Sequence, residues 1–202
     1  KQVIPGNVFT QQKLGLAGEY FSDINLGTKV LDRNDSNINF DWGDGVPDPN
    51  LNWQEATNDP NQFGTDDFSA RWTGKFKAPV SGEYTFWVNT KTDDGIRLWV
   101  NGQALVNAWE VGDGIEEYSA KITLEAGQAY DFKLEYYDPD SAAGVQVSWD
   151  APGLDRQIIP SEVFFQQVQS YSNQGSGYYT GSLNPVTKLT SSGPIRNQEG
   201  IY

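Results

Sequence analysis

The fold of this chain is decided by the stretch Thr92-Asp93-Asp94-Gly95-Ile96-Arg97-Leu98-Trp99-Val100-Asn101-Gly102. Within it, Ile96, Leu98 and Val100 alternate with two other residues, which is the two-residue period of a strand with one buried face. Asn101-Gly102 is a pair that often forms the tight turn of a β-hairpin. The stretch therefore predicts a strand that follows a loop and ends in a hairpin.

Two adjacent carboxylates, Asp93 and Asp94, stand in the loop before this strand. Adjacent carboxylates repel each other, so a loop that presents both usually has a cation or abundant water to absorb the charge. Gly95 follows and lets the backbone take conformations that other residues avoid. Two interpretations stay open from these residues alone: a cation site, or a solvated turn with no metal.

Short alternating runs continue on both sides of the central stretch. We expect strands at 16–21, 68–77, 83–90, 103–106, 116–124, 129–137 and 145–149. No segment has a convincing helical period of apolar residues. Many short strands with turn residues between them predict an all-β fold, either an antiparallel sandwich or a barrel.

Residues 32–65 are dense in Asp, Asn, Gly and Pro, and we expect a long loop there with little regular structure. A loop of this length in a compact domain is usually functional or packed on itself. Its aspartates could bind a second cation, although solvated turn formers are the favoured interpretation.

The composition excludes several classes of function. The 202 residues carry 27 acidic against 14 basic side chains, so nucleic acid and anionic membranes are poor partners, whereas cations and neutral sugars are better ones. Cysteine and histidine are absent, which removes disulfides, thiol chemistry, the usual general base and the commonest zinc ligand. No apolar run approaches the length of a membrane span, so we expect no membrane insertion.

Catalysis is not expected. Paired carboxylates perform glycoside hydrolysis at separations of about 5–10 Å. Asp93 and Asp94 are instead neighbours in the sequence, and nothing indicates that one of them stays protonated. We therefore expect a protein that is not an enzyme.

Two segments of the chain resemble each other. Residues 2–12 and 157–167 are identical at seven of eleven positions, at an offset of 155 residues. They are either closing strands of a repeat, with 1–14 left over from a preceding unit or forming an N-terminal arm, or two similar edge segments of one domain. We expect the domain proper at 15–167, and a linker or extended C-terminal arm at 168–202.

The chain begins with Lys1 and carries no visible secretory signal, so we expect a monomeric module from a longer chain. An acidic, cysteine-free composition that is rich in Asn, Asp, Gly and Thr indicates an exported bacterial surface protein. The expected location is therefore extracellular, at the cell surface.

Several motifs of the chain fall in the order seen in one known family. They are Phe68 to Trp72 with Gly74, Ser81-Gly82-Glu83-Tyr84-Thr85-Phe86, Asp93-Asp94-Gly95 with Leu98-Trp99-Val100-Asn101-Gly102, Ala126-Gly127, Glu135-Tyr136-Tyr137 and Trp149. Over roughly residues 15–165 they resemble the domain named after the fourteen-kilodalton module of anthrax protective antigen. The resemblance implies an antiparallel β-sandwich with long loops at one end. Because the family includes adhesins, glycosidases, toxins and signalling proteins, it implies the fold more firmly than the function.

One branch of that family, the flocculins of yeast and related epithelial adhesins, consists of calcium-dependent lectins. By this resemblance, Asp93 and Asp94 are metal ligands joined by a cis peptide bond. Asp138 is a further ligand, followed by the backbone carbonyls of Asp140 and Ala142. This sequence departs from the yeast pattern, because Asp138 stands where those lectins have Asn and Pro139 follows it.

The chemistry of these groups suits Ca²⁺, which takes six to eight hard oxygen ligands. The three carboxylates and two carbonyls supply about five of them, and two sugar hydroxyls could take open positions. Trp109 either stacks on the sugar or has a core or turn role. We expect a calcium-dependent lectin module of a bacterial surface adhesin that binds glycans, with Asp93, Asp94, Asp138, Asp140 and Trp109 contacting the sugar. The alternative is a non-catalytic spacer, or an accessory domain of a repetitive surface protein or a sugar-active enzyme.

Overall fold

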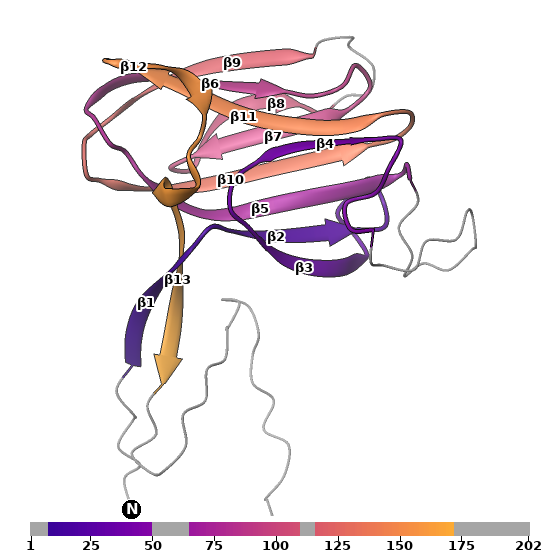
Figure 1. Cartoon of the computed structure of the whole chain (residues 1–202), viewed down its shortest axis with the longest axis horizontal. Helices are drawn as coiled ribbons and strands as arrows, with labels where there is room; N and C mark the ends of the chain where they lie inside the picture. The colour runs from indigo at the N-terminus through magenta and orange to yellow at the C-terminus, as the bar shows by residue number, and fades with distance from the viewer. Residues whose placement is uncertain (1–7, 50–64, 110–115, 172–202) are drawn as a thin grey trace, which may run out of the picture. The chain divides into compact units, whose positions relative to one another are not determined.

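The computed structural model describes residues 8–49, 65–109 and 116–171, and shows strands in two layers (Figure 1). A compact unit spans Gln12–Gln167, and Lys1–Gln11 with Val168–Tyr202 form a second unit, most of which lies outside the described residues. In the part of the chain that is described, no helix is long and apolar enough to cross a membrane.

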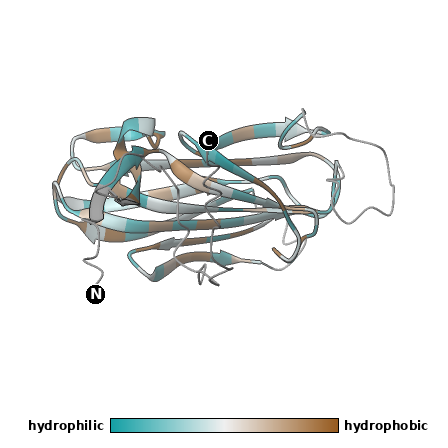
Figure 2. Ribbon diagram, turned by 90° about the horizontal axis from the view of Figure 1, so that it is seen from below, coloured by the Kyte–Doolittle hydropathy of each residue, from teal (hydrophilic) through white to brown (hydrophobic). Residues whose placement is uncertain are grey.

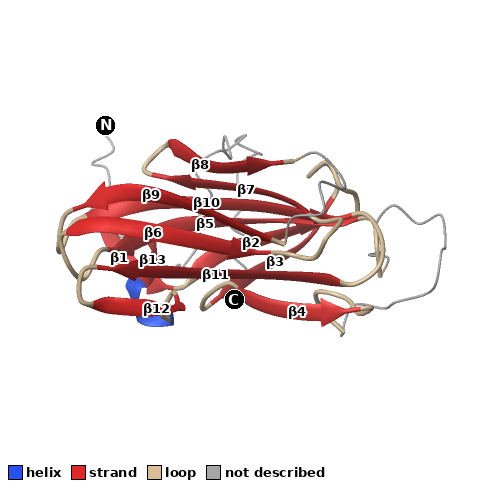
Figure 3. Ribbon diagram, turned by 90° about the horizontal axis from the view of Figure 1, so that it is seen from above, coloured by secondary structure: helices blue, strands red, loops and turns tan. Residues whose placement is uncertain are grey.

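The two sheets are antiparallel and contain all the regular strands (Figure 3). The larger sheet has the order β1 (Val8–Leu14), β13 (Phe164–Tyr171), β5 (Phe68–Lys77), β10 (Ala129–Asp138), β7 (Gly95–Val100) and β8 (Gln103–Ala108), with β2 (Leu16–Phe21) paired to β5 and β3 (Lys29–Asp35) paired to β2. The smaller sheet has the order β12 (Leu154–Ile158), β11 (Ala143–Ala151), β6 (Gly82–Asn89) and β9 (Glu117–Leu124), with β4 (Asn39–Gly43) paired to β11. A short 3₁₀ turn, Ser161–Val163, precedes β13. The expected all-β sandwich is confirmed.

The core lies between the sheets and is built from alternating residues of the facing strands. Tyr84, Phe86 and Val88 of β6 are fully buried, whereas Thr85 and Trp87 between them are half-buried and lie on the other face of the strand. Across the sandwich, the ring centroid of Phe76 lies 5.8 Å from that of Phe86 and 5.6 Å from that of Trp149. Figure 2 shows the resulting alternation of hydrophobic and hydrophilic residues along the strands. Burying each such ring contributes about 1.5–3 kcal/mol, so the frame behind the loops is rigid.

Residues 32–65 are not the structureless loop that the sequence suggests, because β3 and β4 occupy part of this range. β3 pairs on one side only, with β2, so it tolerates exposed polar residues that look like loop residues in the sequence. Its last residue, Asp35, is buried and accepts hydrogen bonds from Tyr20 (2.7 Å) and Trp72 (2.7 Å). Residues 50–64 of this expected loop lie outside the described residues.

The chain after β11 also holds more strand than expected. β12 follows the strand at 145–149, and β13 runs on to Tyr171, inside the range expected as a linker. Of the two similar segments, residues 8–12 lie in β1, whereas residues 157–167 run from the end of β12 through the 3₁₀ turn into β13. β1 and β13 are hydrogen-bonded neighbours in one sheet. Residues 172–202 lie outside the described residues.

Strand register brings the predicted site together. β7 and β10 run antiparallel with Gly95 opposite Tyr137, and β5 and β10 pair with Phe68 opposite Asp138. The start of β7, the start of β5 and the end of β10 therefore lie at the same end of the sandwich. The loops at 93–94 and 138–142 meet there, as expected.

Candidate functional site

Asp94 is fixed at this end by a turn and by a buried tyrosine. Its backbone N–H donates to the carbonyl of Lys91 (3.3 Å), and its Oδ2 accepts from the backbone N–H of Lys91 (2.9 Å). The hydroxyl of Tyr136 in β10 donates to the same Oδ2 (2.9 Å) and accepts from the backbone N–H of Gly144 (3.0 Å). Burial and the nearby carboxylates raise the pKa of Tyr136, so this hydroxyl stays protonated. Tyr136 thus links both loops.

Asp138, the last residue of β10, is fully buried next to Asp94. Both oxygens of Asp138 and Oδ1 of Asp94 lack a hydrogen-bond donor among the described residues, apart from a proton that the two carboxyls could share. Burial raises the pKa of Asp94 to about 6. Burial, followed by the negative charge of Asp94, raises the pKa of Asp138 to about 9. These two carboxyls need either a proton or a cation.

Two further carboxylates, Asp93 and Asp66, lie close enough for their charges to raise the pKa of Asp138. Both are half-buried. We did not predict Asp66 from the sequence. It stands two residues before Phe68, the residue opposite Asp138, so antiparallel pairing of 68–77 with 129–137 would have indicated it.

The nearby ammonium of Lys91 does not neutralise the site. Lys91 holds Asp94 through its backbone, but its Nζ pairs with Asp41 (3.1 Å). The aliphatic part of Lys91 lies against Gly144, where an added Cβ would meet its Cε at 2.9 Å. Trp42 of β4 packs on Tyr136, and the centroids of the two rings are 5.7 Å apart. Sequence reasoning missed both Lys91 and Trp42.

The loop that carries Asp140 and Ala142 connects β10 to β11. Asp140 is exposed, and its Oδ1 accepts from the backbone N–H of Ser141 (2.8 Å). Ser141 has a left-handed backbone (φ +68°), which turns the chain back toward β11. The structure therefore places Asp140 and Ala142 directly after Asp138, and their role as carbonyl ligands stays a prediction.

Trp109 lies against Tyr137, the residue before Asp138. The Tyr137 hydroxyl donates to the Trp109 carbonyl (3.1 Å), and the two rings meet edge to face at 4.7 Å. Gly95 permits this arrangement, because a Cβ there would lie 2.0 Å from the Tyr137 ring. The Arg97 guanidinium lies 3.8 Å from the centroid of the Trp109 ring. Trp109 thus packs on the residue that precedes Asp138, and part of its ring is already in contact with protein. Because side chains alternate along a strand, Tyr137 and Asp138 point to opposite faces of β10.

The expected cis peptide bond is wrong, because every peptide bond in the described residues is trans, including that between Asp93 and Asp94. The turn that begins at Lys91 already directs Asp94 inward to Tyr136 with an ordinary backbone.

The described residues also hold no group of three or more His, Cys, Asp or Glu side chains placed to bind a metal by themselves. The groups that do fit a hard cation are the buried, unsatisfied oxygens of Asp94 and Asp138, which carbonyls, water and the charges of Asp93 and Asp66 would have to supplement.

This fold is that of one known family. Residues 12–162 match the model of the PA14 domain, and the chain belongs to this family. It is 39% identical over 151 residues to anti-sigma-I factor RsgI3 of Acetivibrio thermocellus, a match that covers 75% of this chain and 21% of that protein. It is 32% identical over 191 residues to the protective antigen of Bacillus anthracis, covering 93% of this chain and 22% of that protein. The chain therefore spans about a fifth of the length of these relatives.

Solved structures of PA14 domains and of an anti-sigma factor domain-containing protein have a similar fold. An anti-sigma factor domain-containing protein superposes with a TM-score of 0.66 at 38% identity, over 76% of this chain and 47% of that chain. A PA14 sugar-binding domain from an RTX adhesin (TM-score 0.53, 16% identity, 76% and 98% covered) shows likeness of fold alone. The same holds for the A domain of epithelial adhesin 6 from Candida glabrata, solved in complex with Galβ1-3GlcNAc (TM-score 0.57, 15% identity, 77% and 88% covered).

Proposed function

We propose that this chain is a calcium-dependent carbohydrate-binding module of a bacterial surface protein. The observation that carries the proposal is the pair Asp94 and Asp138, two buried carboxyls that face each other with unsatisfied oxygens and with no basic side chain paired to them among the described residues. Leaving a buried charge unpaired costs several kcal/mol, so such a pair is retained where a cation takes the place of the missing partner. Membership of a family that includes a sugar-binding adhesin domain supports the same function.

In this proposal, Asp93, Asp94 and Asp138 hold the ion through carboxylates, and Asp140 and Ala142 through carbonyls. Bound calcium would supply open coordination positions that two neighbouring hydroxyls of a pyranose can fill. The protein supplies the rest of the selectivity. Tyr136 and the turn at Lys91 fix the direction of Asp94. Trp109, which packs on Tyr137, would contact the sugar.

A second candidate concerns the parent protein rather than the site. The 39% identity to an anti-sigma-I factor over 75% of this chain favours a ligand-sensing domain of a protein that acts on a sigma factor. In that case the glycan would be a signal rather than an attachment point. The neighbouring domains of the parent chain would distinguish this role from adhesion, while the calcium and sugar chemistry would be the same in both.

Isothermal titration tests the site. Calcium should bind first, and fucose, mannose, glucose or galactose should then bind on the order of millimolar, or about −4 kcal/mol, because one sugar buries little surface. Many copies on a surface would be needed for strong attachment. Asp94→Ala should remove both calcium and sugar binding, while Glu83→Gln, which removes an exposed ion pair on the other sheet, should change neither.

Two outcomes would contradict the proposal. Sugar binding that survives a chelator would show that calcium does not hold the sugar. An absence of binding to every member of a broad glycan array, in calcium, would favour the spacer instead.

A further inference from the structure

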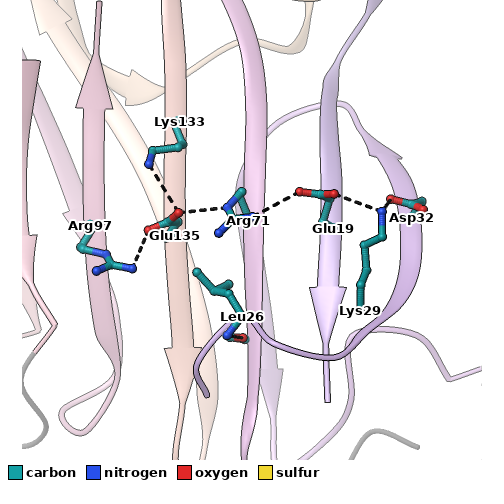
Figure 4. A network of polar contacts seen from close by, with 9 residues as sticks. Glu19, Leu26, Lys29, Asp32, Arg71, Arg97, Lys133 and Glu135 are labelled. Carbon is teal, nitrogen blue, oxygen red and sulfur yellow. Dashed lines mark hydrogen bonds and ion pairs between the residues drawn. The ribbon is translucent and has the colours of Figure 1, made fainter. Parts of the chain in front are cut away.

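Three cations converge on one buried carboxylate on the outer face of the larger sheet. Glu135 of β10 accepts from Nε of Arg71 (2.9 Å), from Nη2 of Arg97 (2.6 Å) and from Nζ of Lys133 (3.4 Å) (Figure 4). The register places Arg71 and Arg97 directly opposite Glu135 on the two neighbouring strands. Glu135 is 4% exposed, whereas the side chains of the three cations are 27–39% exposed. The carboxylate is thus covered by an excess of positive charge that reaches solvent.

Two indole rings lie among these cations. Nζ of Lys133 is 3.6 Å from the centroid of the Trp99 ring, and the guanidinium of Arg97 is 5.6 Å from it. Arg97 also lies over Trp109 at 3.8 Å. Trp99 and Trp109 are half-buried, so each keeps some surface for a ligand. Nε of Arg97 has no acceptor among the described residues.

We propose that Arg97, Lys133, Trp99 and Trp109 form a second binding surface, the cationic face, for a sugar unit that carries a carboxylate. The planar guanidinium and the ammonium would hold the carboxylate, and the indole rings would pack against the sugar ring. Arg71 also pairs with Glu19 (3.6 Å), whereas Arg97 and Lys133 share the single carboxylate of Glu135 among the described residues. An anionic group from outside therefore complements this face better than a neutral one.

The cationic face and the calcium site are built on the same strand, β10. Glu135 and Asp138 are three residues apart on β10, or about 10 Å along the strand. Trp109 contacts both Arg97 and Tyr137, and Tyr137 immediately precedes Asp138 on β10. One oligosaccharide could therefore place hydroxyls at the calcium site and an acidic unit on the cationic face. In naming a glycan as the ligand, this inference rests on the proposed function.

The net charge of −13 does not prevent such binding. At physiological salt the Debye length is about 8 Å, so distant acidic residues are largely screened while contacts at the cationic face are not. The affinity for an acidic ligand should accordingly fall as salt is raised.

A matched pair of probes tests the cationic face: a β-1,4-linked glucuronic acid oligomer, and the cello-oligosaccharide of the same length, which differs only in oxidation at C6. With calcium present, the acidic oligomer should bind about tenfold more tightly to the native chain. Arg97→Gln combined with Lys133→Gln should abolish that preference. Lys121→Gln, on the other sheet, is the matched control and should retain it. Lys133→Gln alone, which removes the longest of the three contacts, keeps the test valid if the double variant does not fold.

Equal or weaker binding of the acidic oligomer to the native chain, or a preference that survives the double variant, would overturn the inference. Asp94→Asn separates it from the calcium proposal. If only the calcium proposal fails, the acidic preference persists in Asp94→Asn and in chelator. If only the cationic face fails, calcium-dependent binding of neutral monosaccharides persists in the double variant.

Discussion

Glu135 and Asp138 lie three residues apart on the same strand, and both are buried carboxyls, but their surroundings are opposite. Burial alone would raise the pKa of Glu135. The hydrogen bond from Arg71 and the charges of Lys133, Arg97 and Arg71 outweigh burial and hold that pKa below its usual range. Asp138 faces other carboxylates, and its pKa rises to about 9. Cations of the same sheet thus neutralise Glu135, whereas Asp138 needs a proton or a bound cation.

The largest effect should come from removing each carboxylate in turn. Glu135→Gln leaves three cations around a neutral side chain and should lower the free energy of unfolding by about 3 kcal/mol, at the low end for a broken buried pair because the cations are partly solvated. Asp138→Asn, measured in chelator, should leave the free energy of unfolding unchanged or raise it, because the amide removes a buried carboxylate that has no partner. Urea unfolding of both variants measures this contrast. Equal destabilisation would show that Asp138 is as well balanced as Glu135.

Calcium should stabilise the native chain through the Asp94–Asp138 pair. At a calcium concentration 100 times its Kd, the native chain should gain about 2.7 kcal/mol, because the ion binds only the folded state. Asp94→Ala should gain nothing, and Glu135→Gln should gain as much as the native chain, since its carboxylate faces away from the site. Thermal unfolding with and without calcium provides the measurement. A calcium response that survives in Asp94→Ala would remove Asp94 from the site.

The two carboxyls should also give pH dependences of opposite sign. The pKa of Glu135 is lowered on folding, so its stabilisation is present above its unfolded pKa and is lost as the pH falls through the folded value. The pKa of Asp138 is raised, so in chelator the folded state binds the extra proton, and stability falls as the pH rises from about 4 toward 9. Asp138→Asn should remove the second effect, because the amide binds no proton in this range. Urea midpoints across this range test the sign, and a rise with pH in chelator would contradict it.

This contrast also shows what the sequence could and could not predict. The alternation in Ile96 to Val100 predicts β7 because one face of that strand is buried, and the motif resemblance places Asp138 beside Asp94. β3 gives no such signal, since an edge strand pairs on one side only. The three cations on Glu135 depend on which residues lie opposite one another on separate strands. A register of that kind is set by packing of the whole sheet rather than by local pattern.

Replacing Asp66 should have the smallest effect, and it tests how far charges beyond Asp94 and Asp138 contribute to calcium binding. It is half-buried and acts on Asp138 through its charge, while its Oδ2 accepts from the hydroxyl of Thr65 (3.2 Å). A charge that contributes without direct contact is partly screened, so Asp66→Asn should weaken calcium binding only a few-fold, or by less than about 1 kcal/mol. Calcium titration at two salt concentrations measures this, and the loss should shrink at the higher salt. If Asp66→Asn instead abolished calcium binding at both concentrations, Asp66 would be a direct ligand, and the ligand set taken from the yeast lectins would be incomplete.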